Sequence, residues 1–130
     1  MSTIGKKILV IEDDPGFLRY LGLVFDKEGF EIIAASNGLE GLRKARQEKP
    51  DLIVLDVMLP GLDGFEICHR LRSEEPTAKL PILMLSAKGQ DADKTTAARV
   101  GASVFLSKPV DRVVLLNTLR DLLGEKRQIT

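Results

Sequence analysis

The chain has 130 residues, enough for one domain with a sizeable hydrophobic core, and its 44% hydrophobic and 29% charged content is ordinary for a globular protein. A formal net charge of zero argues against nucleic acid or an anionic membrane as an obligate partner, and no apolar run approaches the roughly 20 residues needed to span a bilayer. Cys68 is the single cysteine, so no internal disulfide can form, and with no signal-like apolar segment at the start we expect a cytoplasmic protein.

Short apolar runs alternate along the chain with longer amphipathic stretches. The first run, KILVI, is typical of a buried strand, and the next stretch carries apolar residues at helical spacing. Pro15 suits the first position of that helix, and Gly29 ends it. The alternation continues to the end of the chain, with a polar loop expected at 74–80. It predicts strands at 7–11, 31–35, 51–56, 81–86 and 103–107, and helices at 15–28, 39–49, 63–73, 91–100 and 111–123.

Five βα units in one chain indicate an α/β fold. The strands are continuous apolar runs, which is typical of a parallel sheet covered on both faces. Right-handed crossovers then give a doubly wound sandwich. We expect one domain over residues 1–130, with a core at about 6–124 and a tail or linker stub at 124–130. In such a sheet, ligands bind outside the carboxyl ends of the strands, where the strand order reverses.

Polar side chains stand at the predicted ends of four strands. Glu12 and Asp13 follow the first, Asp56 ends the third, Ser86 ends the fourth and Lys108 follows the fifth. Clustered carboxylates should raise at least one pKa unless a positive charge lies between them. Oxygen ligands suit a hard cation, Mg²⁺ above all. A lysine and a hydroxyl can hold a phosphate, and without a glycine-rich nucleotide loop the pattern favours an aspartyl phosphate formed on the chain itself.

Each of these residues also has a plain structural interpretation. Asp56 alone would start a turn, the acidic pair would cap a helix, and Lys108 would be a surface lysine. Asp14 is interpreted as a helix-start residue and not as a ligand. His69 is expected to face solvent on the third helix, with Cys68 in the core beside it. The charged runs at 70–75 and 125–127 are interpreted as solvated surface.

The ordered motifs IEDD, LDVMLPGLDG, LSA and KP resemble those of the receiver domain of two-component response regulators. The resemblance covers residues 6–124. It implies a flavodoxin-like (βα)5 sandwich with a five-stranded parallel sheet of order 2-1-3-4-5. It also implies a Mg²⁺-dependent phosphoacceptor in a His-to-Asp phosphorelay. Such a domain catalyses its own phosphorylation and dephosphorylation and has no turnover substrate.

The resemblance assigns a role to each polar group at the strand ends. Asp56 matches the phosphoacceptor, and Ser86 and Lys108 match the residues that contact the phosphoryl group. Glu12 matches an acid that often acts through water. The groups expected to hold Mg²⁺ are Glu12, Asp13, Asp56 and the backbone carbonyl of Met58.

The resemblance also implies a switch. Ser86 and Phe105 match its two residues, with serine in place of the frequent threonine and phenylalanine in place of the frequent tyrosine. Phe105 therefore has no hydroxyl to hydrogen-bond in either rotamer. Lys108 is expected to form a cis peptide with Pro109, which only an X-Pro bond tolerates cheaply. Two side chains are expected to flank the approach of the water that hydrolyses the phosphoryl group: Met58 and Lys88.

The implied partners are a sensor histidine kinase or phosphotransfer protein, and a downstream effector protein or missing output domain, with no direct nucleic acid and no membrane. The last predicted helix carries a broad apolar stripe, formed by Val113, Val114, Leu115, Leu116, Leu119, Leu122 and Leu123. The stripe fits a well-buried terminal helix, or a partner face with the helix at 91–100 and the strand at 103–107. That face would also allow a homodimer.

Two functions of other classes stay open. A flavodoxin-like FMN carrier would absorb visible light, but the chain lacks tryptophan and a Ser/Thr-rich phosphate loop after the first strand. A phosphorylation-independent scaffold with a receiver fold would not need the complete acidic set. A stand-alone receiver and the front part of a larger regulator are both compatible with the sequence.

Overall fold

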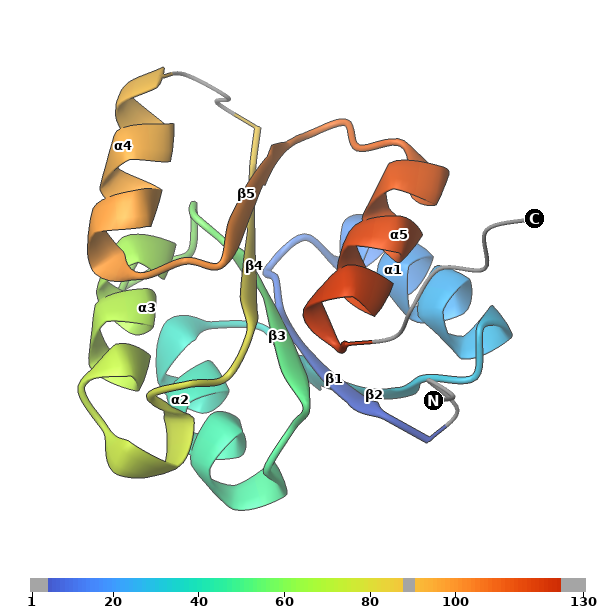
Figure 1. Ribbon diagram of the computed structural model, residues 1–130, viewed down its shortest axis with the longest axis horizontal. Helices are drawn as coiled ribbons and strands as arrows, with labels where there is room; N and C mark the ends of the chain where they lie inside the picture. The colour runs from blue at the N-terminus through green and yellow to red at the C-terminus, as the bar shows by residue number, and fades with distance from the viewer. Residues whose placement is uncertain (1–4, 88–90, 125–130) are drawn as a thin grey trace.

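The computed structural model describes residues 5–87 and 91–124, which form a parallel sheet between two layers of helices (Figure 1). The strand order is β2-β1-β3-β4-β5, as expected. The strands are β1 (Lys7–Ile11), β2 (Glu31–Ala35), β3 (Leu52–Asp56), β4 (Ile82–Ser86) and β5 (Val104–Ser107). The helices are α1 (Pro15–Lys27), α2 (Gly38–Glu48), α3 (Gly64–Arg72), α4 (Asp91–Val100) and α5 (Arg112–Leu122). Two expectations lie outside the described residues: the role of Lys88 and the tail beyond Gly124.

Both faces of the sheet are buried, which explains why the strands are continuous apolar runs. Alternate residues of β1 point to opposite sides: Leu9 and Ile11 pack with α2, α3 and α4, whereas Ile8 and Val10 pack with α1 and α5. Figure 1 shows the same division, with α1 and α5 on one side of the sheet and α2, α3 and α4 on the other. Each fully buried aliphatic side chain contributes about 1.5–3 kcal/mol.

The helices begin within one residue of their predicted starts, and side chains cap the first turns of α1, α2, α3 and α5. Each capping oxygen accepts a backbone N–H of the first turn, which is worth about 0.5–2 kcal/mol per cap. The four caps are Asp14 to Gly16, Asn37 to Glu40, Asp63 to Glu66 and Asp111 to Val114. The helix predicted at 111–123 therefore starts one residue later, since Asp111 is its N-cap. No helix in the described part of the chain is long and apolar enough to cross a bilayer.

The segment between α3 and β4 differs from its prediction as a loop, because it contains a 3₁₀ helix, η1 (Glu75–Thr77). The buried Thr77 hydroxyl donates to the carbonyl of Leu71 at 2.5 Å and fixes this turn. The interpretation of the charged run at 70–75 as solvated surface is wrong for Arg72. Its guanidinium donates to the carbonyls of Thr77, Ala78 and Gly101.

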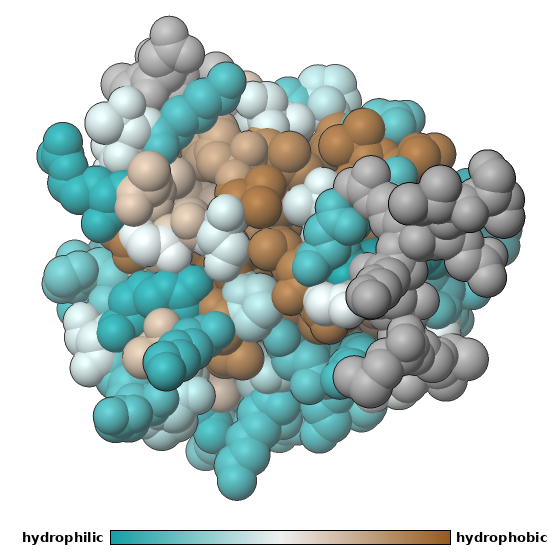
Figure 2. Space-filling view, in the orientation of Figure 1, coloured by the Kyte–Doolittle hydropathy of each residue, from teal (hydrophilic) through white to brown (hydrophobic). Residues whose placement is uncertain are grey.

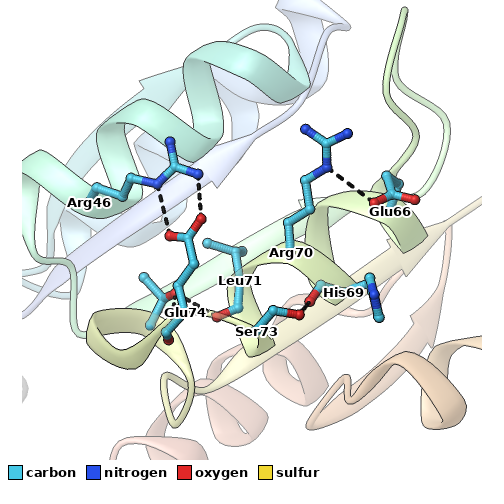
Figure 3. A network of polar contacts seen from close by, with 8 residues as sticks. Arg46, Glu66, His69, Arg70, Leu71, Ser73 and Glu74 are labelled. Carbon is cyan, nitrogen blue, oxygen red and sulfur yellow. Dashed lines mark hydrogen bonds and ion pairs between the residues drawn. The ribbon is translucent and has the colours of Figure 1, made fainter.

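Two surface ion pairs involve α3 and the residues just after it. Figure 3 shows Arg46 of α2 holding Glu74 just beyond α3, with the two N–O distances 2.8 and 2.5 Å. Arg70 pairs with Glu66 one turn away on α3, at 3.1 Å. Exposed pairs of this kind contribute little stability.

The apolar stripe of α5 is only partly buried. Leu115, Leu116 and Leu119 lie in the core, whereas Val113 and Val114 are 63% and 46% exposed. Figure 2 shows apolar surface gathered over β5 and toward α5. The stripe therefore serves both to seat the terminal helix and to form an exposed apolar patch at its start.

Candidate functional site

The predicted strand ends meet at one edge of the sheet, and backbone hydrogen bonds fix them there. The N–H of Glu12 donates to the carbonyl of Ala35 at 3.0 Å, which extends the pairing of β1 with β2 beyond the last strand residue. The N–H of Lys108 donates to the carbonyl of Ser86 at 2.8 Å, which does the same for β5 and β4. Asp56 ends β3 between them, next to the point where the strand order reverses.

Three carboxylates come together at this edge. Glu12, Asp13 and Asp56 each offer an oxygen, and these oxygens all lie within 4.8 Å of one another. Glu12 and Asp56 are buried, at 2% and 6% exposure, whereas Asp13 faces solvent. Hard oxygen donors with one side open to water fit Mg²⁺, which takes one or two carboxylates and keeps several waters. The residues present therefore fit the expected metal.

Lys108 supplies the positive charge of the cluster. Its Nζ lies 2.7 Å from an oxygen of Glu12 and 3.6 Å from an oxygen of Asp56. It also lies 4.3 Å from the centroid of the Phe17 ring. The helical spacing of apolar residues carries no sign of this contact, because Phe17 and Lys108 are distant in the chain.

The environment of Asp56 changes its acidity. The pKa of Asp56 is raised to about 6, with burial as the largest cause and the charge of Glu12 as the next. The charge of Lys108 and a hydrogen bond from the backbone N–H of Met58, whose nitrogen lies 3.4 Å from an Asp56 oxygen, lower this pKa. The sequence predicted a raised pKa from repulsion between carboxylates, but loss of solvent is the larger effect here.

Gly64 allows α3 to begin directly against the end of β3. Its N–H donates to the carbonyl of Val57 at 2.8 Å. A Cβ at this position would lie 2.3 Å from the carbonyl oxygen of Asp56, so only glycine fits. Gly64 is therefore the residue at which the chain can enter α3.

The two expected switch residues lie on the same side of the sheet. Ser86 is fully buried at the end of β4, two residues after Met84, so both point toward the α4 layer. Phe105 pairs in register with Met84 and packs, half-buried, against the same layer. The peptide between Lys108 and Pro109 is cis, as expected.

An open hollow of about 510 Å³ borders Asp13, the exposed member of the carboxylate cluster. Met58 forms part of its wall and is 52% exposed, as expected for a side chain that flanks the approach to the site. The lining residues are Asp13, Val57, Met58, Leu59, Pro60, Asp63, Phe65 and Asp93. The hollow leaves room for another molecule beside Asp13.

The residues interpreted as structural are confirmed as such. Asp14 caps α1 and is not among the three carboxylates that converge. His69 is exposed on α3, and Cys68 is fully buried in the core beside it.

Many known proteins are similar to this chain. The response regulator receiver domain family matches residues 8–120 of the chain. Protein PilH of Pseudomonas aeruginosa is 37% identical over 118 residues, covering 91% of this chain and 98% of PilH. The alkaline phosphatase synthesis transcriptional regulatory protein PhoP of Bacillus subtilis is 46% identical over 106 residues, covering 82% of this chain and 43% of PhoP.

Solved structures agree with the sequence relatives. The receiver domain of a Pseudomonas aeruginosa sensor histidine kinase, with a magnesium ion in its active-site cleft, superposes with a TM-score of 0.87 at 27% identity. The alignment covers 93% of this chain and 99% of that one. The chain spans almost all of PilH but less than half of PhoP. The family match includes all five strands and reaches into α5, and it excludes the flavin carrier as an alternative function. The chain belongs to the response regulator receiver domain family, which acts in phosphorelay signalling.

Proposed function

We propose that Asp56 accepts a phosphoryl group from a phosphohistidine on a sensor histidine kinase or phosphotransfer protein. One observation carries the proposal: Asp56 is a buried carboxylate at the strand edge, with the Lys108 ammonium 3.6 Å away and two more carboxylates in reach. With a pKa of about 6, Asp56 is mostly ionised at neutral pH and can act as a nucleophile.

The proposed transfer is a single displacement at phosphorus. An oxygen of Asp56 bonds to phosphorus while the P–N bond to the donor imidazole breaks, and the bonding electron pair returns to the ring nitrogen. The Lys108 ammonium and the Ser86 hydroxyl stabilise the charge on the phosphoryl oxygens. Mg²⁺, when bound, supplies further positive charge there. The groups that would hold it are Glu12, Asp13, Asp56 and the carbonyl of Met58.

The product is an acyl phosphate that water can hydrolyse, so the signal has a limited lifetime. Catalysis then consists of self-phosphorylation and self-dephosphorylation, without a turnover substrate. Met58, half exposed beside the acceptor, would restrict the approach of that water. The phosphorylated state of the chain would therefore be transient.

The output would pass through the surface of α4, β5 and α5. Ser86 would move toward the phosphoryl group, and Phe105 would turn into the space beside it. Their common side of the sheet supports this coupling. The exposed Val113 and Val114 give this surface an apolar patch for an effector, an output domain or a second copy of the chain. We further propose a cytoplasmic location, consistent with one buried cysteine and no internal disulfide.

The test is phosphorylation of the purified chain by a small acyl phosphate, with Mg²⁺ or with a chelator, followed by intact mass. We expect the mass of one phosphoryl group with Mg²⁺ in the wild type and none in Asp56→Asn. The matched control is Asp51→Asn, at the opposite end of β3, where the amide can still accept the Lys7 N–H bond. Phosphate on Asp56→Asn would show that another residue is the acceptor. An unmodified wild type would favour the scaffold function.

A further inference from the structure

We propose that Phe17 is a positioning residue for Lys108, whose ammonium its ring face keeps beside the acceptor. The Nζ of Lys108 lies 4.3 Å from the centroid of the ring, well within the range of a cation–π interaction. This inference rests on the proposed function, in which Lys108 stabilises the transferring phosphoryl group. It adds a residue of α1 to a site otherwise built from strand ends.

The three partners of the ammonium differ in one respect. Glu12 and Asp56, at 2.7 and 3.6 Å, are also carboxylates that we assign to Mg²⁺. The ring of Phe17 is no ligand for a hard cation, because Mg²⁺ selects oxygen donors. If Glu12 held a metal ion, Lys108 would lose its nearest partner, whereas the ring would still attract the ammonium. Phe17 therefore limits how far Lys108 can move from the acceptor.

The ring is held in place before any ligand binds. Phe17 is the third residue of α1, in a first turn that Pro15 starts and Asp14 caps. Its ring stacks on that of Tyr20 one turn later, with centroids 6.1 Å apart and planes inclined by 28°. The Lys108 side chain is only 18% exposed, and reduced hydration strengthens a cation–π contact. Because the ring is fixed and the ammonium is partly dehydrated, we expect the cation–π contact to hold Lys108 in position.

The competing interpretation is that Phe17 only covers the aliphatic stem of Lys108. Phe17→Leu keeps an apolar side chain but removes the π face, whereas Phe17→Tyr keeps the π face. For phosphorylation by a small acyl phosphate with Mg²⁺, we expect Phe17→Leu to be slower by about threefold to tenfold, and Phe17→Tyr to remain within about twofold of wild type. Leu23→Ala shortens an exposed apolar side chain of the same helix and should also remain within about twofold of wild type.

A second readout reports the geometry without any phosphoryl transfer. An aromatic face shields protons above it, so the ε-methylene protons of Lys108 should resonate upfield in the wild type and in Phe17→Tyr. They should return to the ordinary lysine position in Phe17→Leu. The signal is assigned by its loss in Lys108→Arg and is recorded both with chelator and with saturating Mg²⁺. An upfield shift that persists with Mg²⁺ supports a contact between Phe17 and Lys108 that is kept when the metal binds.

The outcomes separate this inference from the proposed function. The inference is overturned if Phe17→Leu keeps the wild-type rate, if Phe17→Tyr is as slow as Phe17→Leu, or if the Lys108 shift is the same in all three proteins. A wild type that takes up no phosphate would overturn the proposed function, whereas the spectra would still decide whether Phe17 holds Lys108.

Discussion

The Lys108 ammonium lies closer to Glu12 than to Asp56, at 2.7 Å against 3.6 Å. Both carboxylates are buried, and two buried charges without a cation would cost several kcal/mol. Lys108 therefore acts as a counter-ion of the metal-free fold as well as a proposed contact of the phosphoryl group. These two roles need different positions of one side chain, which makes its freedom of movement part of the mechanism.

Replacing Lys108 with methionine should lower the free energy of unfolding of the metal-free protein by about 2–4 kcal/mol, because it leaves buried carboxylates unpaired. Mg²⁺ restores positive charge, so it should stabilise Lys108→Met more than it stabilises the wild type. Urea unfolding with chelator and with saturating Mg²⁺ measures both effects. Lys94→Met, on the exposed side of α4, is the control. Equal stabilisation of wild type and Lys108→Met by Mg²⁺ would contradict the counter-ion role.

The raised pKa of Asp56 predicts a pH dependence of stability. A carboxyl group with a pKa of about 6 when folded binds its proton more tightly than in the unfolded chain. Its favourable contribution is therefore present below about pH 4 and is lost as the pH rises through about 6. Between about pH 4 and neutral pH, the free energy of unfolding of the metal-free wild type should fall by about 2–3 kcal/mol relative to that of Asp56→Asn.

Urea unfolding of both proteins in chelator, at several pH values across this window, checks the prediction. The difference between the two proteins isolates Asp56 from the other carboxyl groups. Parallel curves for wild type and Asp56→Asn would mean that folding leaves the acidity of this group unchanged.

The close approach at Gly64 predicts a large cost for one methyl group. In Gly64→Ala the new Cβ would collide with the backbone of Asp56 and Val57, so we expect a loss of about 2–4 kcal/mol in the free energy of unfolding. Gly22→Ala is the matched control, because nothing lies near its Cβ within α1 and alanine favours the helix by about 0.5–1 kcal/mol. Similar effects of the two changes would show that α3 can shift away from β3.

Much of the fold and the site could be predicted because local patterns determine them. Apolar runs predicted the strands, helix-start residues such as Asp14 predicted where a helix begins, and the parallel topology brought Asp56 and Lys108 to one edge. The contact of Lys108 with Phe17 could not be predicted, since it joins residues at opposite ends of the chain through their side-chain conformations. The short helix η1 was missed for a related reason: it depends on the buried hydroxyl of Thr77.

The different surroundings of Asp13 and Asp14 give a sharp test of which acids hold a metal. Asp13 is exposed and lies in the carboxylate cluster, whereas Asp14 accepts the Gly16 N–H at 3.0 Å as the cap of α1. Asp13→Asn should weaken Mg²⁺ binding by about tenfold or more, because it removes one charged ligand. Asp14→Asn should keep both the cap, since asparagine is as good an N-cap, and the Mg²⁺ affinity within about threefold. Titration calorimetry gives both affinities, and urea unfolding in chelator shows whether each variant is folded. Equal losses of Mg²⁺ affinity in the two variants would mean that the site responds to overall negative charge and not to a defined ligand.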